Sequence, residues 1–173
     1  LMVKLSPSEK VVLTRRSTEN PEAFDYYMRA RNALYRRTKT DINSAIQLFQ
    51  RAIELDRRYA TAYAGLGEAY ATLYQDLERN EIYLDRAVEA CHKALMYDAT
   101  LSEAYAALAI ACFNKKMLDD ALEAGRKAIE LDPKYVIPYN ELGIVYSDLT
   151  KYDKAIEMYQ KAIELDPKYA LPY

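Results

Sequence analysis

Three side chains near the middle of the chain could carry chemistry: His92, Cys91 beside it, and Cys112. His92 is the only histidine, and no nucleophile motif surrounds it, so a histidine-based catalytic triad would depend on this residue alone. The two cysteines lack the paired spacing of a metal site. We therefore interpret His92 as a solvated or packed side chain. The cysteines are expected to be buried thiols that behave as small hydrophobes, with a redox pair as the alternative.

A second candidate is the stretch GLGEAY at residues 65–70, which superficially matches a dinucleotide-binding loop. It lacks the third glycine of that motif and lies within a helical pattern that no strand precedes. Helix packing explains Gly67 better. The carboxylates of the recurring IELD segments are interpreted as ordinary solvation of helix ends. The sequence thus predicts no catalytic residue, no metal site and no cofactor, and we expect the protein not to be an enzyme.

The composition favours helices over sheets. About half of the residues (51%) are apolar, which argues against a disordered chain. Only four glycines occur, beside 17 tyrosines and many Ala, Leu, Glu and Lys residues. No apolar run approaches the roughly 20 residues that span a bilayer, and the opening LMVKLSPSEK lacks the apolar stretch of a signal peptide. We expect a cytoplasmic protein without membrane contact.

The net charge of −2 is unevenly spread along the chain. Residues 1–60 contain 12 Lys or Arg and 7 Asp or Glu, whereas residues 61–173 contain 12 and 19. The first third is therefore a possible face for an anionic partner, although a solvated surface is the simpler interpretation. Nucleic-acid binding would need a basic stripe along the whole chain, so we expect none.

An internal repeat indicates the structural elements that hold the candidate residues in place. KAIELDPKY occurs at residues 127–135 and again at 161–169, and the related RAIELDRRY and KALMYDATL begin at residues 51 and 93. The spacings between the four starts are 42, 34 and 34 residues, so the second unit carries eight extra residues, which we place around residues 75–84. A fixed period of this length indicates stacked structural units.

Each unit contains two helical stripes separated by a turn. In the fourth copy, Tyr139, Leu142, Gly143 and Tyr146 recur at helical spacing, and a second stripe ends before Pro167. The pattern Y-x2-L-G-x2-Y…A-x3-Y-x2-A-x4-P resembles the tetratricopeptide repeat (TPR) family. The resemblance implies an all-α fold, a right-handed superhelical solenoid of about four helix-turn-helix repeats.

We divide the chain into an extension at residues 1–21, with a short helix at 7–16, and a repeat array at 22–173. The units are placed at about residues 24–58, 60–100, 102–135 and 136–169, and a truncated fifth unit begins at 170–173. The first copy departs most from the family pattern, because Arg31 stands where a small residue is usual. Ile156, Tyr159 and Ile163 on the last helix are expected to be partly uncovered, which predicts self-association through this unit.

A finer similarity concerns the segments NPEAFDYYMRARNALYRRT, AIQLFQRAIELD and ATAYAGLGEAY. They are similar to repeat modules appended to bacterial protein kinases, adenylate cyclases and winged-helix regulators. This similarity implies a non-enzymatic docking or sensory scaffold, part of a larger bacterial protein, that binds a protein or peptide. The alternative is an architectural spacer or a self-assembling oligomerisation module.

In this family the first helices line a concave groove, and the resemblance implies which positions point into it. Ile110, Phe113 and Ile144 would form an apolar centre, with Arg36 and Asp148 at opposite ends. Of the Lys, Asn and Arg clamp with which some members grip an acidic chaperone tail, only Asn32 is matched, so we do not expect that ligand. The complete predicted groove consists of Met28, Asn32, Tyr35, Arg36, Ala64, Glu68, Ala71, Thr72, Ala106, Ile110, Phe113, Asn114, Asn140, Ile144, Ser147 and Asp148.

Overall fold

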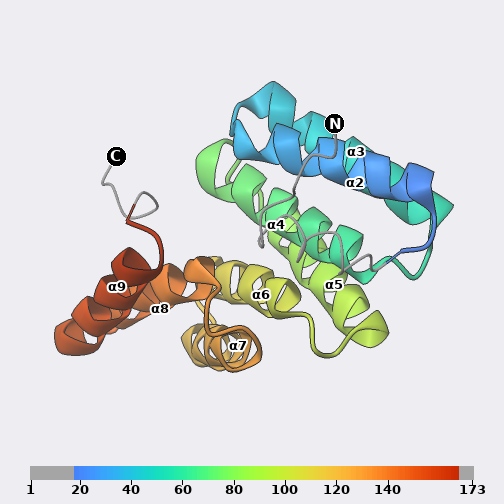
Figure 1. The fold of residues 1–173 in the computed structure, drawn as a ribbon. Helices are drawn as coiled ribbons and strands as arrows, with labels where there is room; N and C mark the ends of the chain where they lie inside the picture. The colour runs from blue at the N-terminus through green and yellow to red at the C-terminus, as the bar shows by residue number, and fades with distance from the viewer. Residues whose placement is uncertain (1–17, 168–173) are drawn as a thin grey trace.

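The computed structural model describes residues 18–167, which form eight helices and no strand (Figure 1). The predicted all-helical repeat solenoid is confirmed. The short helix predicted at residues 7–16 lies outside the described residues. The helices are α2 (Pro21–Tyr35), α3 (Lys39–Leu55), α4 (Ala60–Asp76), α5 (Glu81–Tyr97), α6 (Ser102–Asn114), α7 (Leu118–Leu131), α8 (Val136–Asp148) and α9 (Tyr152–Leu165).

An aspartate, at the end of the IELD segments and of ALMYD in the second unit, ends the second helix of each pair. Asp56, Asp98 and Asp132 are C-cap residues with extended backbone, at φ −138°, −144° and −139°. Each carboxylate accepts a hydrogen bond from the backbone N–H two residues later, at 3.0, 2.9 and 3.1 Å. An Asx turn of this kind offers the backbone an alternative to further helix. The interpretation of these carboxylates as ordinary solvation is therefore incomplete.

The turn between the two helices of a pair uses a left-handed residue in three of the four units. Arg37, Lys116 and Thr150 have φ values of 54°, 63° and 56°. Their backbone N–H groups donate to carbonyls three residues earlier, at 3.2, 2.9 and 2.9 Å, and so close the end of the first helix. Glycine or asparagine usually occupies such a position, because a Cβ atom disfavours the left-handed region.

Small residues let the two helices of a pair approach closely. A Cβ atom added to Gly67 would lie 2.6 Å from the Cys91 Sγ, and one added to Gly143 would lie 2.5 Å from the Tyr159 ring. The interpretation of Gly67 as a packing residue agrees with this geometry. Ala128 and Ala162, at equivalent places in the third and fourth units, are also buried. The core therefore follows the small-against-large pattern of the sequence.

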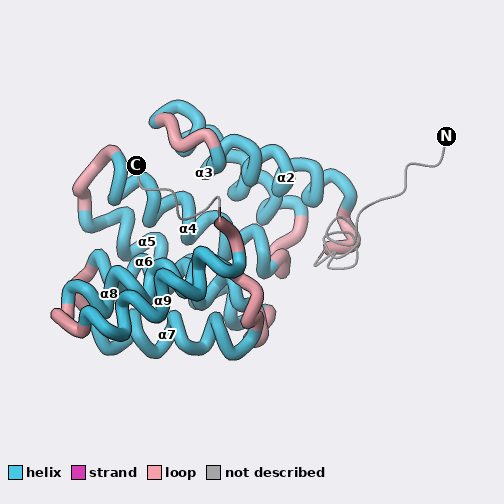
Figure 2. The backbone as a smooth tube through the Cα atoms, turned by 60° about the vertical axis from the view of Figure 1, so that its left-hand side comes forward, coloured by secondary structure: helices cyan, strands magenta, loops and turns pink. Residues whose placement is uncertain are grey.

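The solenoid curves because only one set of helices is in mutual contact. Contacts join α2 to α4, α4 to α6 and α6 to α8, whereas within residues 18–167 none joins α3, α5, α7 and α9 to one another. The first helices of the pairs therefore lie on the inside of the curve and the second helices on the outside. The backbone trace in Figure 2 shows these pairs following one another through short loops.

The eight extra residues of the second unit lengthen its helices instead of forming a long loop. Compared with the third unit, α4 is four residues longer than α6, and α5 is three residues longer than α7. The loop at residues 77–80 adds the remaining residue. None of the described helices has the length and apolar character needed to cross a membrane.

Candidate functional site

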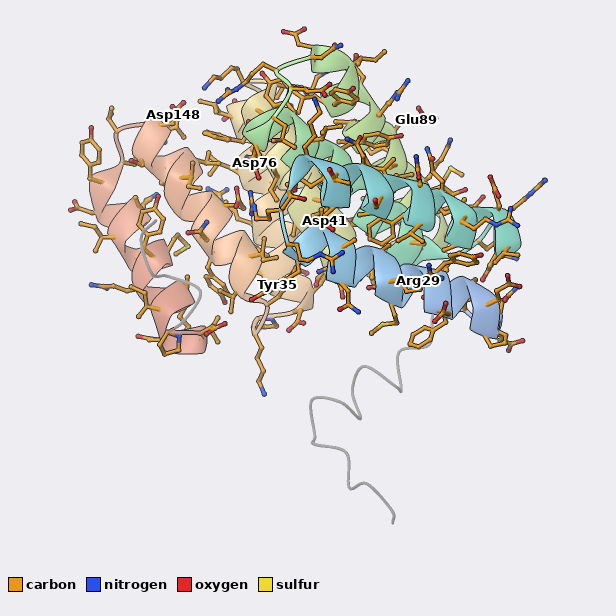
Figure 3. The ribbon with its side chains drawn as sticks, turned by 90° about the horizontal axis from the view of Figure 1, so that it is seen from above. Arg29, Tyr35, Asp41, Asp76, Glu89 and Asp148 are labelled. Atoms are coloured by element: carbon orange, nitrogen blue, oxygen red, sulfur yellow. The ribbon has the colours of Figure 1, made fainter. Side chains whose placement is uncertain are left out.

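The inner faces of α2, α4, α6 and α8 contain the predicted groove residues, but these residues differ widely in accessibility. Tyr35 is the most open, with 89% of its surface exposed at the end of α2 (Figure 3). Asn32, Arg36 and Asp148 are also exposed. Eight are partly buried, namely Met28, Glu68, Ile110, Phe113, Asn114, Asn140, Ile144 and Ser147.

Four predicted groove residues offer no usable surface. Ala71 is fully buried, and Ala64, Thr72 and Ala106 are buried almost completely. The first helices pack against one another, and this packing buries small residues on their sides. The Thr72 hydroxyl donates to the Glu68 carbonyl at 2.9 Å within its own helix. We therefore remove these four positions from the proposed groove.

The proposed apolar centre is shared with the hydrophobic core. Phe113 packs against the core of the third and fourth units, and the Lys116 Nζ lies 5.2 Å from the centroid of its ring. Ile110 packs against the separate core of the first two units. Both side chains therefore serve stability as well as any ligand.

Arg31, which departs from the repeat pattern, supplies a distinctive feature of the inner face. Ala30, its neighbour, is fully buried in the core, whereas Arg31 forms a hydrogen-bonded ion pair through Nη1 with the Glu68 Oε2 of α4. The Glu68 carboxylate raises the pKa of Arg31. Arg31 therefore places a guanidinium between the first two units, at the repeat position that Gly67 and Gly143 occupy in the second and fourth units.

Carboxylates outnumber this guanidinium at the centre of the inner face. Burial raises the pKa of Glu141 on α8 to about 7, an effect opposed by the Asn140 hydrogen bond and by Arg37, and increased by Glu68. The Asn140 Nδ2 donates to the Glu141 Oε1 at 3.5 Å. Arg37 and Glu68 belong to the first two units, so Glu141 faces the inside of the curve.

The carboxylate of Glu103 also lies near this region, as its influence on Tyr27 of α2 indicates. Burial raises the pKa of Tyr27, Arg31 opposes the rise, and Glu103 and Glu68 add to it. Glu68 therefore acts on Arg31, Tyr27 and Glu141, and Glu103 acts on Tyr27, which places these carboxylates in one region of the inner face. We call Glu68, Glu103, Glu141 and Arg31 the acidic centre.

Ion pairs join the turn of the first unit to the lengthened part of the second. Arg37 donates to both carboxylate oxygens of Asp76, with Nε and Nη2 at 3.0 and 3.1 Å. The Lys39 Nζ lies 2.8 Å from the Glu78 Oε1. Asp76, labelled in Figure 3, ends α4. Glu78 lies in the loop that follows. The eight-residue insertion therefore creates contacts with the preceding unit.

Of the three residues that could carry chemistry, the two cysteines are buried near each other and His92 is exposed. Cys91 and Cys112 are free and buried, and burial raises the pKa of both thiols. His92 is exposed on α5. No group of three or more potential metal ligands occurs within residues 18–167.

Comparison with known proteins identifies the family. Models of the tetratricopeptide repeat match residues 102–135 and 136–169, and a further TPR repeat model matches residues 38–73. Together the three matches span more than half of the chain. The chain belongs to the tetratricopeptide repeat family, as its sequence pattern predicted. Such repeats are generally non-catalytic scaffolds for protein interaction.

Solved structures show the same fold. A crystal structure of MamA is 31% identical, with a TM-score of 0.57, over 78% of this chain and 74% of the other. TTC0263, a thermophilic TPR protein of Thermus thermophilus, is 25% identical, with a TM-score of 0.73, over 91% and 81%. The first TPR of Spaghetti (RPAP3), bound to the HSP90 peptide SRMEEVD, is 17% identical, with a TM-score of 0.62, over 78% and 98%. A comparison with curated proteins found no match.

Proposed function

We propose that the chain is a scaffold that binds a protein or peptide segment on the inner face of its curve. The observation that carries this proposal is the continuous inner surface of α2, α4, α6 and α8 with the acidic centre in its middle. Exposed Tyr35 and partly buried Ile144 provide apolar surface beside those charges. An apolar surface with polar groups around it is how peptide sites are commonly built.

The charge of the acidic centre favours a segment with a basic side chain. Glu68 is already paired with Arg31, so Glu103 and the ionised form of Glu141 would attract a Lys or Arg and repel a carboxylate. Like charges in a partly desolvated site are costly. The RPAP3 relative is bound to a peptide that ends in EEVD. An acidic tail of that kind is not the ligand proposed here.

The test is fluorescence anisotropy with blocked peptides that differ only in a central Lys, Ala or Glu between apolar residues. The Lys peptides should bind best and the Glu peptides worst. Glu141→Lys should remove the preference, because it reverses a charge in the acidic centre. Glu123→Lys makes the same change on an exposed position of the outer helix α7 and should preserve it. A preference for Glu peptides in the unaltered protein would refute the proposed ligand class.

We further propose that the array is the docking or sensory part of a larger bacterial protein in the cytoplasm. The similarity of its first two units to modules appended to bacterial kinases and cyclases supports this context. Two free thiols, Cys91 and Cys112, suit a reducing compartment. Isolation of the natural gene product and measurement of its full mass would test whether an effector domain accompanies the repeats.

A second candidate function is self-assembly through α9. Equivalent apolar positions in the first and third units, Ile46 and Leu122, are 8% and 7% exposed, whereas Ile156 on α9 is 53% exposed. In the third unit, α8 packs against this face. Light scattering should show mass rising with concentration, and Ile156→Lys should suppress the rise. Tyr159 is less suitable for this test because it packs against Gly143.

A further inference from the structure

A hollow of about 340 Å³ lies on the outer side of the array, away from the acidic centre. Its residues come from the outer helices α3 and α5 and from the inner helix α4. Leu66, Tyr70 and Ala90 form the nearly buried floor, and the Tyr63 ring stands at one edge. The hollow therefore offers apolar contact to a small group.

Hydrogen-bond donors converge on this hollow. The Arg86 guanidinium lies 5.7 Å from the centroid of the Tyr70 ring, which holds it at the wall. Within residues 18–167 no hydrogen bond or ion pair engages that guanidinium. The Gln50 Nε2 donates to the Tyr70 hydroxyl at 3.2 Å, so the hydroxyl proton can be donated to another acceptor.

The remaining charged residues leave the hollow with net positive charge. The Lys93 Nζ pairs with the Glu89 Oε1 at 2.7 Å on the same helix, so these two charges offset each other. Arg86 is the uncompensated charge. A planar guanidinium with free donors matches a carboxylate, to which it can give two parallel hydrogen bonds.

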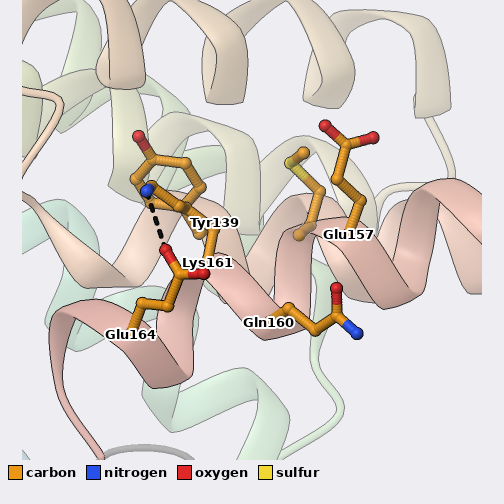
Figure 4. A pocket seen from close by; sticks show the side chains of 6 residues that line it. Tyr139, Glu157, Gln160, Lys161 and Glu164 are labelled. Atoms are coloured by element: carbon orange, nitrogen blue, oxygen red, sulfur yellow. Dashed lines mark hydrogen bonds and ion pairs between the residues drawn. The ribbon is translucent and has the colours of Figure 1, made fainter.

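A hollow at the corresponding place in the fourth unit has the opposite character (Figure 4). It measures about 330 Å³ and contains Glu157 and Glu164 beside Lys161, which pairs with Glu164 at 2.8 Å. The Tyr139 hydroxyl already donates to the Pro133 carbonyl at 3.0 Å. This second hollow has the same position in the repeat but a net negative lining, so it provides an internal control.

We propose that the hollow of the second unit binds a carboxylate that is carried beside an apolar side chain, as at the C-terminal residue of a peptide. Arg86 and the Tyr70 hydroxyl would hold the carboxylate, and the apolar side chain would rest on Leu66 and Ala90. This site is separate from the acidic centre, which would repel the same ligand. It would give the array a second contact point on its outer surface.

The experiment is an NMR titration of the isotopically labelled chain with N-acetyl-leucine, which mimics a chain end. The amide signals of Leu66 and Ala90 should shift saturably. N-acetyl-leucinamide, the uncharged match, should bind at least about tenfold more weakly, because it cannot form the charge-assisted bonds. Isovalerate has the apolar group and the carboxylate but no peptide amide. Binding of isovalerate as tight as that of N-acetyl-leucine would refute the peptide chain end as the source.

Two variants complete the test. Arg86→Gln keeps much of the exposed side chain but removes the charge, and it should weaken N-acetyl-leucine about tenfold. Lys161→Gln removes the positive charge that lines the fourth-unit hollow and should leave the affinity unchanged; circular dichroism checks that both variants fold. The proposed site would be overturned if N-acetyl-leucinamide bound as tightly as N-acetyl-leucine, or if Arg86→Gln did not weaken binding. It would also be overturned if the shifts centred on Tyr139, or if no saturable shift occurred.

Discussion

At the scale of single residues, the fold depends on small side chains at places where helices touch. Ala128 is completely buried, as are Ala45, Ala87 and Ala121 on the same series of outer helices. Close packing leaves no room for added volume at such sites. Surface alanines of the same chain have no such restriction.

Replacement of Ala128 by Leu should therefore lower the free energy of unfolding by about 1–3 kcal/mol, the usual effect of overpacking a core. Denaturant unfolding followed by circular dichroism measures the change. Ala99→Leu is the matched control, because Ala99 is exposed in a loop. A neutral Ala128→Leu variant would show that this contact is not part of the core.

Thr150 presents a backbone problem, because a β-branched residue is unfavourable at its φ of 56°. Thr150→Gly should raise the free energy of unfolding by about 1 kcal/mol, since glycine enters this region without a Cβ penalty. Thr40→Gly is the control: Thr40 lies exposed in α3, where glycine should destabilise the helix. Thermal unfolding of both variants gives the comparison, and a loss of stability in Thr150→Gly would contradict the assigned turn.

Glu141 should make stability depend on pH. Its folded-state pKa of about 7 lies above the ordinary value, because burial disfavours the charged form. Its favourable contribution is thus complete below about pH 4 and is lost as the pH rises through about 7. Glu141→Gln should be more stable than the natural chain at pH 8, by roughly 1–3 kcal/mol.

The difference between the two proteins should vanish near pH 4, where the natural carboxyl is neutral in the folded state and largely so in the unfolded state. Denaturant melts at pH 4, 6 and 8 measure this dependence. Glu123→Gln on exposed α7 provides the control and should show no comparable trend. An advantage of the Glu141→Gln variant that is equal at all three pH values would rule out titration as its cause.

At the scale of elements, the inserted residues of the second unit act on the first unit. Asp76 and Glu78 pair with Arg37 and Lys39 across the two turns. The first unit packs against α4 chiefly through α3, and these ion pairs add to that contact at the end of α4. Salt weakens exposed pairs of this kind.

The double variant Asp76→Asn/Glu78→Gln should speed hydrogen exchange in α2 and α3 at low salt, while α7 should be unaffected. The difference should disappear near about 1 M salt, where the Debye length is only about 3 Å. Glu130→Gln removes an ion pair within α7 and is the control. Unchanged exchange in α2 and α3 at low salt would mean that the insertion does not hold the first unit.

At the scale of the whole molecule, stability is distributed between neighbouring units, as in other solenoids. Within residues 18–167, α9 contacts only α8, whereas α3, α5 and α7 each contact two helices. Native-state hydrogen exchange should therefore be fastest in α9 and slowest in α4 and α6. Uniform protection along the array would indicate one cooperative unit instead. Self-association through α9 would slow exchange in that helix. The same measurement on the Ile156→Lys variant, in which self-association should be suppressed, therefore shows the exchange of α9 in the single chain.

The sequence by itself determined the family, the helix pairs and their stacking. These follow from local signals: the stripes of Tyr, Leu and Gly at helical spacing, the 34-residue period, and the proline that follows the second stripe of the last units. Such signals act over a few residues and repeat in every unit, so they can be recognised without coordinates.

Only the tertiary structure decided which side chains reach the inner face. Arg31 and Glu68 are 37 residues apart in sequence, and Arg37 and Asp76 are 39 apart. These two contacts depend on how α2 and its turn pack against α4, and the second also depends on the lengthening of α4. The packing of the first helices also buries Ala71 and Thr72, although the family pattern assigned them to the groove. A repeat pattern specifies contacts within and between adjacent units, whereas accessibility depends on how tightly the particular side chains let those units pack.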